Sequence, residues 1–394
     1  MRRKGMVISM KNTDRPIVID CFKLVKGAGK SIGIYNLALN LTRNLSAYIK
    51  TLDKSEQKRI VVLGNSKNRK DFDIDGVEFR EINKNPLDKI TCILWELFEV
   101  SILAKKLNAE KILYPRGYAS MLHLTKEQVI IHDMIPFFYD ENFPGVLGRF
   151  ENFYIMWRLK ASARKADKVI TISEASKKDI LKYAGDVSDK ITVINNGYNG
   201  IKNCDKYICD NFEEKKDYII AVTSTLPHKN AAGIIDAYVE YCKMETEPLP
   251  LKIVGIGGLE DIANQELKQV PDKKILDKIT FIKYIESNEE FYKLIAEAKI
   301  FLFLSLIEGF GFPPVEAMQL GTPVICSGNS SLPEVVGDAA VLVNPDDSKS
   351  VGVEISKLLN DMQTYNTLVQ KGFINAKRFS WDEIIVKYWE SLVK

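Results

Sequence analysis

Two glutamates, Glu308 and Glu316, stand at the two ends of a segment rich in glycine and proline. The segment is Gly-Phe-Gly-Phe-Pro-Pro-Val (309–315); an apolar run, 300–304, precedes it, and a short helical pattern, 315–320, follows it. In a strand, loop and helix of this kind, the N–H groups of the loop and of the first helical turn form a positive pocket suited to phosphate. A carboxylate at each end could hold hydroxyl groups on both sides of a diphosphate. The pattern therefore predicts a site for a nucleotide sugar.

Hydroxyl groups and a lysine follow the predicted strand 218–222 and could bind the same diphosphate. Thr223 and Ser224 come directly after that strand, and Lys229 precedes a helical segment. A lysine beside hydroxyls and the free N–H groups of a helix start is suited to a diphosphate leaving group. A lysine on a solvated surface is the alternative interpretation.

One of the three histidines, His132, closes an apolar run and is a candidate for contact with the sugar. Parallel α/β sheets bind ligands at the carboxyl ends of their strands, and a neutral imidazole can hydrogen-bond a sugar hydroxyl. The alternative is a histidine satisfied in the core, with Asp133 capping the next helix.

The glycine-rich stretch 27–33 follows the first predicted strand. We favour a turn in which Gly33 lets the backbone approach a ligand, and an ordinary turn capped by Ser31 is the alternative. A nucleotide-binding P-loop requires glycine where this chain has Leu24. A hydrolase nucleophile elbow at Ser31 requires the strand to run straight into the serine, but the apolar run ends near Asp20.

The sequence shows no cluster of residues at the spacing of a usual metal site. Asp71-Phe-Asp73 matches a short pattern of metal-assisted transferases, but it lies in a charged stretch, and matches of three letters are frequent. The six cysteines are scattered singly, and we expect free thiols. We expect no metal, no other cofactor and no nucleic-acid partner.

Strand-like and helical patterns alternate along the chain, which predicts a doubly wound α/β fold with mainly parallel sheets. We expect two Rossmann-like domains, 1–200 and 217–377, with a deep ligand cleft between them. Residues 201–216 are the expected linker, and an aromatic-rich helix within 378–394 is expected to pack back on the first domain. The predicted strands are 16–20, 59–63, 111–114, 129–132, 168–172, 191–194, 218–222, 251–254, 279–282, 300–304, 323–326 and 340–343, and notable predicted helices are 87–107 and 146–166.

The charges are unevenly distributed. Residues 1–200 carry 34 Lys and Arg against 23 Asp and Glu, whereas the remainder carries 21 against 29. A basic half fits a face that meets anionic lipid headgroups or a polyphosphate acceptor, although unbiased drift of the surface gives the same asymmetry. The segment 150–168 mixes aromatic and basic residues, as a membrane-surface helix does and as a domain helix with a basic solvent face also does.

No apolar run reaches the roughly 18–20 residues that span a bilayer, and the start of the sequence has no signal-peptide core. We therefore expect a cytoplasmic protein, with peripheral contact at the inner face of the cell membrane as a hypothesis.

Taken in this order, these stretches resemble the retaining glycosyltransferase family 4, which has the GT-B fold and includes enzymes of bacterial surface polysaccharides. The resemblance is strongest in Leu-Ser-Leu-Ile-Glu-Gly-Phe-Gly-Phe-Pro-Pro-Val-Glu-Ala-Met-Gln-Leu-Gly-Thr-Pro-Val-Ile (304–325) and Ser-Ser-Leu-Pro-Glu-Val-Val-Gly-Asp-Ala-Ala (330–340). It extends into the first half through 31–35, 132–136 and 190–197.

The resemblance implies a role for each residue that matches the family's motif. It implies that Glu308 contacts the donor hexose and that Glu316 contacts the ribose hydroxyls. It also implies that the backbone N–H groups of Phe310, Gly311 and Phe312 hold sugar hydroxyls and phosphate.

Further roles follow from the same resemblance. Lys229 would bind the diphosphate, and Gly33 would lie near the diphosphate from the other domain. His132 would contact the donor sugar near the reacting centre, and Tyr284 would lie near the base.

The chain departs from the family at two positions that bear on phosphate binding. The family often has a basic residue soon after the first-domain glycine, whereas Ile34 and Tyr35 follow Gly33 here. The family often has an arginine shortly before the lysine, whereas His228 precedes Lys229 here. Thr223 and Ser224 are therefore expected to share in holding the phosphate.

The function implied is the retaining, metal-independent transfer of a hexose or deoxyhexose from a UDP-, GDP- or dTDP-sugar to a glycan acceptor, with a lipid-linked acceptor favoured, in polysaccharide, lipopolysaccharide, capsule or glycoconjugate synthesis. The family's favoured mechanism is a front-face reaction, and this chain offers phosphate-binding groups but no clear carboxylate pair for double displacement. Two alternatives stay open. One is a non-catalytic protein that binds nucleotide sugars or glycans on the same fold, and the other is a kinase using residues 27–31.

Overall fold

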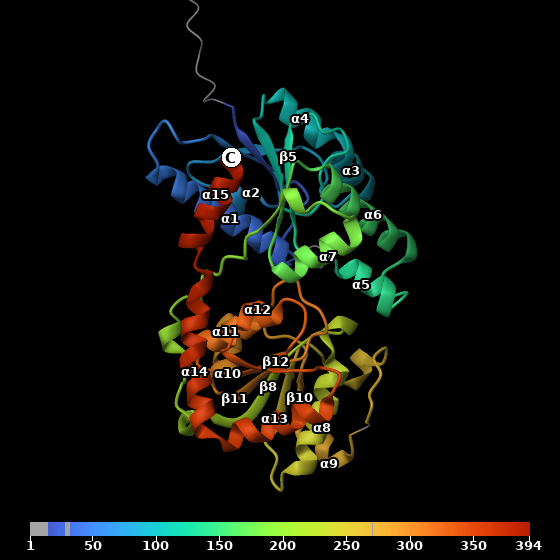
Figure 1. Cartoon of the computed structure of the whole chain (residues 1–394), viewed down its shortest axis with the longest axis vertical. Coiled ribbons are helices and arrows are strands. Elements are labelled where there is room, and N and C mark those ends of the chain that lie inside the picture. The colour runs from blue at the N-terminus through green and yellow to red at the C-terminus, as the bar shows by residue number, and fades with distance from the viewer. Residues whose placement is uncertain (1–14, 28–31, 270) are drawn as a thin grey trace, which may run out of the picture.

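The computed structural model describes residues 15–27, 32–269 and 271–394 (Figure 1). They form two α/β domains that lie one above the other along the long axis of the molecule. Alternate residues of the first strand belong to different apolar clusters, with Ile17 and Ile19 in one and Val18 in the other. The sheet is therefore covered on both faces, which explains why its central strands are continuous apolar runs. The predicted doubly wound α/β fold is confirmed.

The first domain holds a seven-stranded parallel sheet with the order β3-β2-β1-β4-β5-β6-β7. The strand order reverses between β1 and β4, and ligands bind in the crevice beside such a point in parallel sheets. The strands are β1 (Ile17–Asp20), β2 (Ile60–Gly64), β3 (Glu78–Glu81), β4 (Lys111–Tyr114), β5 (Lys126–Ile131), β6 (Lys168–Thr171) and β7 (Ile191–Val193).

The second domain holds a six-stranded parallel sheet with the order β10-β9-β8-β11-β12-β13. Its order reverses between β8 and β11, so the carboxyl ends of these two strands flank a second crevice. The strands are β8 (Lys216–Val222), β9 (Leu251–Val254), β10 (Ile279–Ile282), β11 (Ala298–Phe303), β12 (Val324–Ser327) and β13 (Ala340–Val343).

Helices connect the strands in both domains, and no described helix is long and apolar enough to cross a membrane. The first domain contains α1 (Ile32–Thr51), α2 (Arg69–Phe72), α3 (Lys89–Leu94), the π-helical turn η1 (Trp95–Glu99), α4 (Val100–Lys106), α5 (Ile135–Asn142), α6 (Arg149–Lys165) and α7 (Glu174–Ala184). The helices that follow are α8 (Ala231–Met244), α9 (Lys273–Leu276), α10 (Asn288–Ala296), α11 (Phe312–Gln319), α12 (Leu332–Val336), α13 (Ser348–Asn360), α14 (Met362–Ala376) and α15 (Trp381–Val393).

The helix α15 leaves the second domain and packs beside α1 in the first (Figure 1). The ring of Trp389 lies 6.3 Å from the ring of Tyr48, and the side-chain amide of Gln128 donates to the carbonyl of Ser391 at 2.7 Å. The chain therefore crosses between the domains twice, once after β7 and once between α14 and α15.

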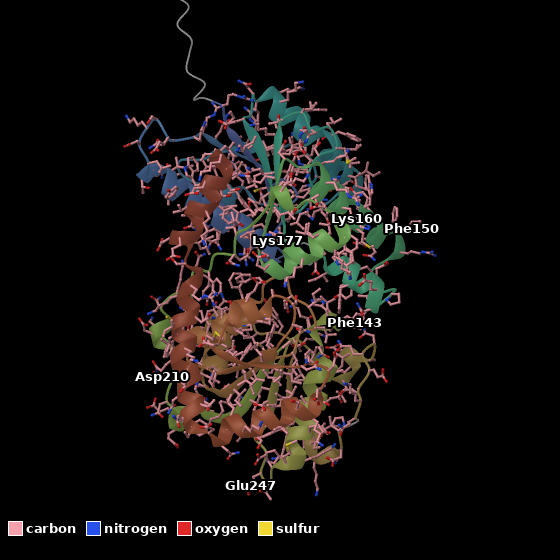
Figure 2. The ribbon with its side chains drawn as sticks, in the orientation of Figure 1. Phe143, Phe150, Lys160, Lys177, Asp210 and Glu247 are labelled. Carbon is pink, nitrogen blue, oxygen red and sulfur yellow. The ribbon has the colours of Figure 1, made fainter. Side chains whose placement is uncertain are left out.

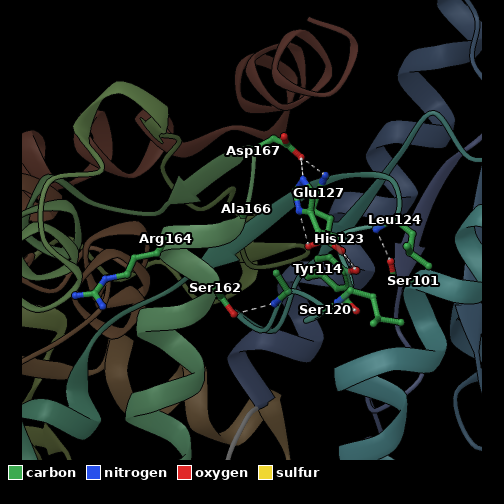
Figure 3. Close-up of polar contacts among 12 residues, drawn as sticks. Ser101, Tyr114, Ser120, His123, Leu124, Glu127, Ser162, Arg164, Ala166 and Asp167 are labelled. Carbon is green, nitrogen blue, oxygen red and sulfur yellow. Dashed lines mark hydrogen bonds and ion pairs between the residues drawn. The ribbon is translucent and has the colours of Figure 1, made fainter.

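A buried polar cluster occupies the amino end of β5, at the opposite end of the strand from His132 (Figure 3). The fully buried Glu127 accepts a hydrogen bond from the Tyr114 hydroxyl at 2.9 Å, and His123 Nδ1 lies 3.4 Å from its other oxygen. Asp167 accepts the N–H of Glu127 at 2.7 Å and lies 3.4 Å from His123 Nε2. Burial raises the pKa of Glu127 to about 7. His123 is therefore part of a structural cluster at the end of the sheet opposite to the predicted site.

Candidate active site

The carboxyl ends of β8 and β11 bring together two predicted site residues, Lys229 and Glu308. Lys229 Nζ donates to Glu308 Oε1 at 2.6 Å, and both side chains are largely buried, with exposed fractions of 25% and 10%. Lys229 ends a 3₁₀ turn (Pro227–Lys229), and the Thr223 hydroxyl donates to its carbonyl at 3.0 Å. The site thus has a cation and a carboxylate side by side at the crevice of the second sheet.

Two serines fix the backbone of Glu308. The hydroxyl of Ser330 donates to the Glu308 carbonyl at 2.8 Å and accepts its N–H at 3.2 Å. The hydroxyl of Ser331 lies 2.9 Å from the same carbonyl and 2.8 Å from that of Phe310. These serines open the second block of the family resemblance, so that block supports the loop that carries Glu308.

Gly311 lets the loop turn directly into α11. Its φ of +101° lies in the region that favours glycine, and a Cβ there would stand 2.6 Å from a methyl carbon of Leu332. Across the described residues, no hydrogen bond reaches the N–H groups of Phe310, Gly311 or Phe312. These N–H groups are free to bind an anion at the start of α11.

Glu316 lies one turn into α11, and its carboxyl group forms no hydrogen bond or ion pair with any described residue. Burial raises the pKa of its carboxyl group to about 7. The side chain is half-buried, and a carboxylate removed from water without a partner is costly, so such groups concentrate at binding sites. The carboxyl group of Glu316 is therefore available to accept hydrogen bonds from the hydroxyl groups of a ligand.

The first domain reaches the same loop through His132 and Asp133, which follow β5. A Cβ built on Gly309 would lie 3.1 Å from the His132 carbonyl and 3.2 Å from an Asp133 carboxylate oxygen, so glycine permits this close approach. His132 Nε2 lies 2.8 Å from the Pro115 carbonyl, and because a carbonyl only accepts, Nε2 carries the proton. Burial lowers the pKa of His132 to about 4. At neutral pH its Nδ1 is therefore an acceptor for a hydroxyl.

Three residues of this region were not predicted from the sequence to belong to the site: Asp133, Tyr139 and His228. Asp133 was considered only as a helix cap, and it does accept the N–H of Ile135 at 3.0 Å, but it also interacts electrostatically with Lys229 and Glu308. Burial raises the pKa of Asp133 to about 6. Its place directly after His132 at a strand end was the signal that could have identified it.

The other two residues, Tyr139 of α5 and His228, hydrogen-bond each other across the domains through the tyrosine hydroxyl and His228 Nδ1. Burial, with the nearby charge of Lys229, lowers the pKa of His228 to about 3, so the ring is neutral. The departure from the family's arginine was a signal for His228, whereas no motif marks Tyr139.

Other predicted site residues lie outside this cluster. A Cβ built on Gly33, near the start of α1, meets no atom of a described residue within 4 Å, so these residues leave the backbone there open to approach. The Ser224 hydroxyl accepts the N–H of Leu226 at 3.3 Å and shapes the turn before Lys229. Tyr284 follows β10 and is 78% exposed.

The remaining sequence candidates have structural partners or cannot be placed. Asp71 accepts a hydrogen bond from the Tyr35 hydroxyl at 2.5 Å, and Asp73 pairs with Arg69 at 3.3 Å. In the ranges that the structure describes, no three or more His, Cys, Asp or Glu side chains are grouped to hold a metal ion. Ser31, on which the nucleophile-elbow and P-loop alternatives depend, lies outside the described residues.

Comparison with known proteins finds two family models on this chain. The model for glycosyl transferases group 1 matches residues 209–373, and the model for glycosyltransferase family 4 matches residues 115–199. The first match includes the Lys229–Glu308 pair and α11, and the second includes His132.

Curated relatives match over part of their length. The O-antigen chain mannosyltransferase RfbU of Salmonella typhimurium is 34% identical over 227 residues, which cover 58% of this chain and 59% of that protein. The O-antigen chain mannosyltransferase B of Escherichia coli is 30% identical over 241 residues, which cover 58% of this chain and 61% of that protein. The matches thus span about three fifths of these relatives.

A solved structure matches nearly the whole chain. HepE of Anabaena, determined in complex with UDP, superimposes with a TM-score of 0.66 at 17% identity and covers 96% of this chain and 99% of its own. At this identity the likeness concerns the fold, and the GT-B fold implied by the sequence resemblance is confirmed. One family model thus matches each domain, glycosyltransferase family 4 in the first and glycosyl transferases group 1 in the second, on a chain that has the GT-B fold.

Proposed function

We propose that the chain is a retaining mannosyltransferase that transfers mannose from a nucleotide diphosphate mannose to a lipid-linked glycan during the synthesis of O-antigen polysaccharide. The observation that carries the proposal is the Lys229–Glu308 pair at 2.6 Å, held beside the free N–H groups at the start of α11. The names of the two O-antigen mannosyltransferase relatives support mannose as the sugar, and the UDP complex of HepE supports a nucleotide diphosphate as the leaving group.

The residues of the second domain would hold the donor. The diphosphate would compete with Glu308 for the ammonium group of Lys229 and would occupy the free N–H groups of the loop. Glu308, released from the lysine, would accept a hydrogen bond from a sugar hydroxyl, and Glu316 would accept hydrogen bonds from the ribose. Cationic and N–H groups aimed at a departing phosphate stabilise the charge that develops there in the transition state.

The reaction itself would proceed on one face of the sugar. The bond between the anomeric carbon and the phosphate oxygen breaks, the acceptor oxygen bonds to the same face, and the acceptor proton passes to the departing phosphate. His132, neutral at working pH, would accept a hydrogen bond from the sugar through Nδ1 and orient it. We propose that this chemistry requires no metal and that the enzyme works peripherally at the cytoplasmic face of the membrane, where the lipid-linked acceptor lies.

The proposal is tested by replacing Glu308 with alanine. With a donor chosen by thermal shift from a panel of nucleotide sugars, we expect transfer to a lipid-linked acceptor to fall by about 100-fold or more. A matched control is Glu110→Ala, because Glu110 forms a similar pair with Lys58 at 2.8 Å outside the cleft, and this variant should keep wild-type transfer. Near wild-type turnover in Glu308→Ala would refute the site.

The same experiment separates an enzyme from a non-catalytic binding protein. If the wild-type chain is stabilised by a nucleotide sugar but neither transfers nor hydrolyses it, the binding-protein alternative holds instead.

A further inference from the structure

Large apolar side chains are exposed on one flank of the first domain. Among the residues that the structure describes, sixteen large apolar or aromatic side chains are exposed, and eleven of them lie between residues 87 and 157. Phe150 is 90% exposed and projects from the outer edge of the molecule (Figure 2), and Phe153 and Ile90 are 72% and 69% exposed. We call the surface formed by six of these side chains the apolar flank: Ile90, Leu94, Phe98, Phe150, Phe153 and Trp157.

The helical stretch from α3 to α4 is apolar on two sides. One side buries Cys92, Trp95 and Val100 against the sheet. A surface helix needs only one apolar stripe to pack on its domain. The second stripe includes Ile90 and Leu94, which are 69% and 45% exposed.

The helix α6 continues this surface. Phe150, Phe153 and Trp157 have the spacing i, i+3 and i+7, which places them on one face of the helix, while Leu159 and Ala163 are buried on another. Backbone segment 118–124 joins the two parts, because the Met121 N–H donates to the Leu97 carbonyl and Arg158 donates to the Ala119 carbonyl, at 2.9 and 2.6 Å. The helices α3, α4 and α6, which border the apolar flank, lie on the same side of the first domain (Figure 1).

Cations border the apolar flank. Five exposed basic residues on these helices form neither an ion pair nor a side-chain hydrogen bond with any residue in the described ranges: Lys89, Lys105, Lys106, Arg149 and Lys165. Apolar and aromatic side chains beside unpaired cations match a bilayer surface, where rings enter the boundary between headgroups and acyl chains and cations meet anionic headgroups.

We infer that the apolar flank docks this protein on a membrane surface that contains anionic lipid. The surface also lies close to the candidate active site, since α5 packs on α6, with Lys160 Nζ 4.9 Å from the centre of the Phe137 ring, and sends Tyr139 across to His228. Docking through this flank therefore brings α6, and α5 packed on it, near the bilayer, where a lipid-linked acceptor would be found. The purpose of docking, access to a lipid-linked acceptor, rests on the proposed function. The docking itself does not, because it is measured without a donor or an acceptor.

The chain contains its own probe for this docking. Of its four tryptophans, Trp157 is 41% exposed, whereas Trp95, Trp381 and Trp389 are 2%, 4% and 6% exposed. Brominated lipids quench a tryptophan that enters the bilayer boundary. With vesicles of phosphatidylcholine and phosphatidylglycerol, we expect quenching of the wild type and its loss in Trp157→Phe.

Binding to the same vesicles is measured by co-sedimentation for matched variants. The double variant Phe150→Ser with Phe153→Ser should reduce the partition coefficient by about tenfold or more, since each ring contributes on the order of 1 kcal/mol or more when removed from water. The double variant Lys105→Glu with Lys106→Glu should reduce binding by about tenfold or more on anionic vesicles and little on phosphatidylcholine alone. Ile374→Ser is the control, because Ile374 is 70% exposed on α14 of the second domain and should bind like the wild type.

Three results would overturn the inference. The first is that the wild-type chain does not sediment with anionic vesicles. The second is that the Ile374→Ser control loses as much binding as the double phenylalanine variant. The third is that the wild type forms a dimer in solution and the double phenylalanine variant is a monomer. The last result would assign the flank to a second copy of the chain. A wild-type chain that transfers to a soluble acceptor but does not bind vesicles would overturn the docking surface alone, whereas a wild-type chain that binds vesicles without transfer would overturn the proposed reaction alone.

Discussion

Replacing Glu316 by glutamine should stabilise the protein above neutral pH. The carboxyl group has no partner among the described residues, and burial raises its pKa from the usual 4.5 to about 7. Because the folded pKa lies above the unfolded one, the folded protein takes up a proton between these two values, and stability is lost as the pH rises through that window. At about 1.4 kcal/mol for each pKa unit, the loss is at most about 3.5 kcal/mol above pH 7. Glutamine does not ionise, so it avoids this loss.

Calorimetry of the wild type and Glu316→Gln at about pH 5 and about pH 8 measures the effect. Solvent reaches the half-buried side chain and lowers the upper figure, and a domain of this size gains about 2–4 °C in Tm per kcal/mol. We therefore expect Tm to rise by about 2–6 °C at the higher pH, with a much smaller change at the lower pH. The same variant should lose part of the stabilisation that a nucleotide sugar gives to the wild type.

Glu308→Gln is the contrasting variant, since Glu308 pairs with Lys229 at 2.6 Å and its removal leaves a largely buried cation alone. Its Tm at the higher pH should stay level or fall. The reasoning about Glu316 would be refuted if Glu316→Gln lowered Tm at the higher pH, or if it changed Tm equally at both pH values.

Three further outcomes are expected. Gly197→Ala should destabilise the fold by about 2 kcal/mol or more in chemical denaturation, because a Cβ there would lie 2.2 Å from the Trp381 ring; an unchanged midpoint would show that the ring moves freely. Glu334→Ala should loosen the contact between the domains and raise the radius of gyration in small-angle scattering, because Glu334 of the second domain accepts the N–H groups of Glu174 and Ala175 at 2.9 and 3.1 Å; an unchanged scattering curve would assign closure to other contacts. Transfer should persist in excess EDTA, and a complete loss restored by a divalent cation would contradict the metal-independent reaction.

The fold followed from the sequence where strands are apolar throughout. The strand β3 was missed because its sequence, Glu-Phe-Arg-Glu, is charged and mostly exposed at the edge of the sheet, where pairing to β2 rather than burial defines it. The predicted helix 87–107 is divided into α3, η1 and α4, with its start capped by Asp88. The π-helical turn begins at Trp95, whose ring N–H donates to Asp20 at 3.0 Å. Periodicity along one segment cannot show such a turn, since its contact is with another strand.

The site was predictable where each residue lies at a strand end. Lys229 and Glu308 come after neighbouring strands of one sheet, so parallel topology alone brings them to the same edge. The bond between Tyr139 and His228 depends on how two domains dock, and no pattern within either domain encodes that geometry. The roles of Glu308, Glu316 and the other donor-binding residues stay predictions until the variants above are measured.

The position of α15 also bears on how the chain is synthesised. Residues 381–393 are translated after the whole second domain, yet Ile384, Tyr388 and Leu392 belong to the same apolar cluster as Ile17 of the first strand. On the ribosome, this apolar face of the first domain therefore stays exposed while the second domain is translated. A stop codon before Trp381 would thus destabilise the first domain, although the codon lies after the second. Chaperones should bind the nascent chain mainly at the face of α1 that α15 later covers.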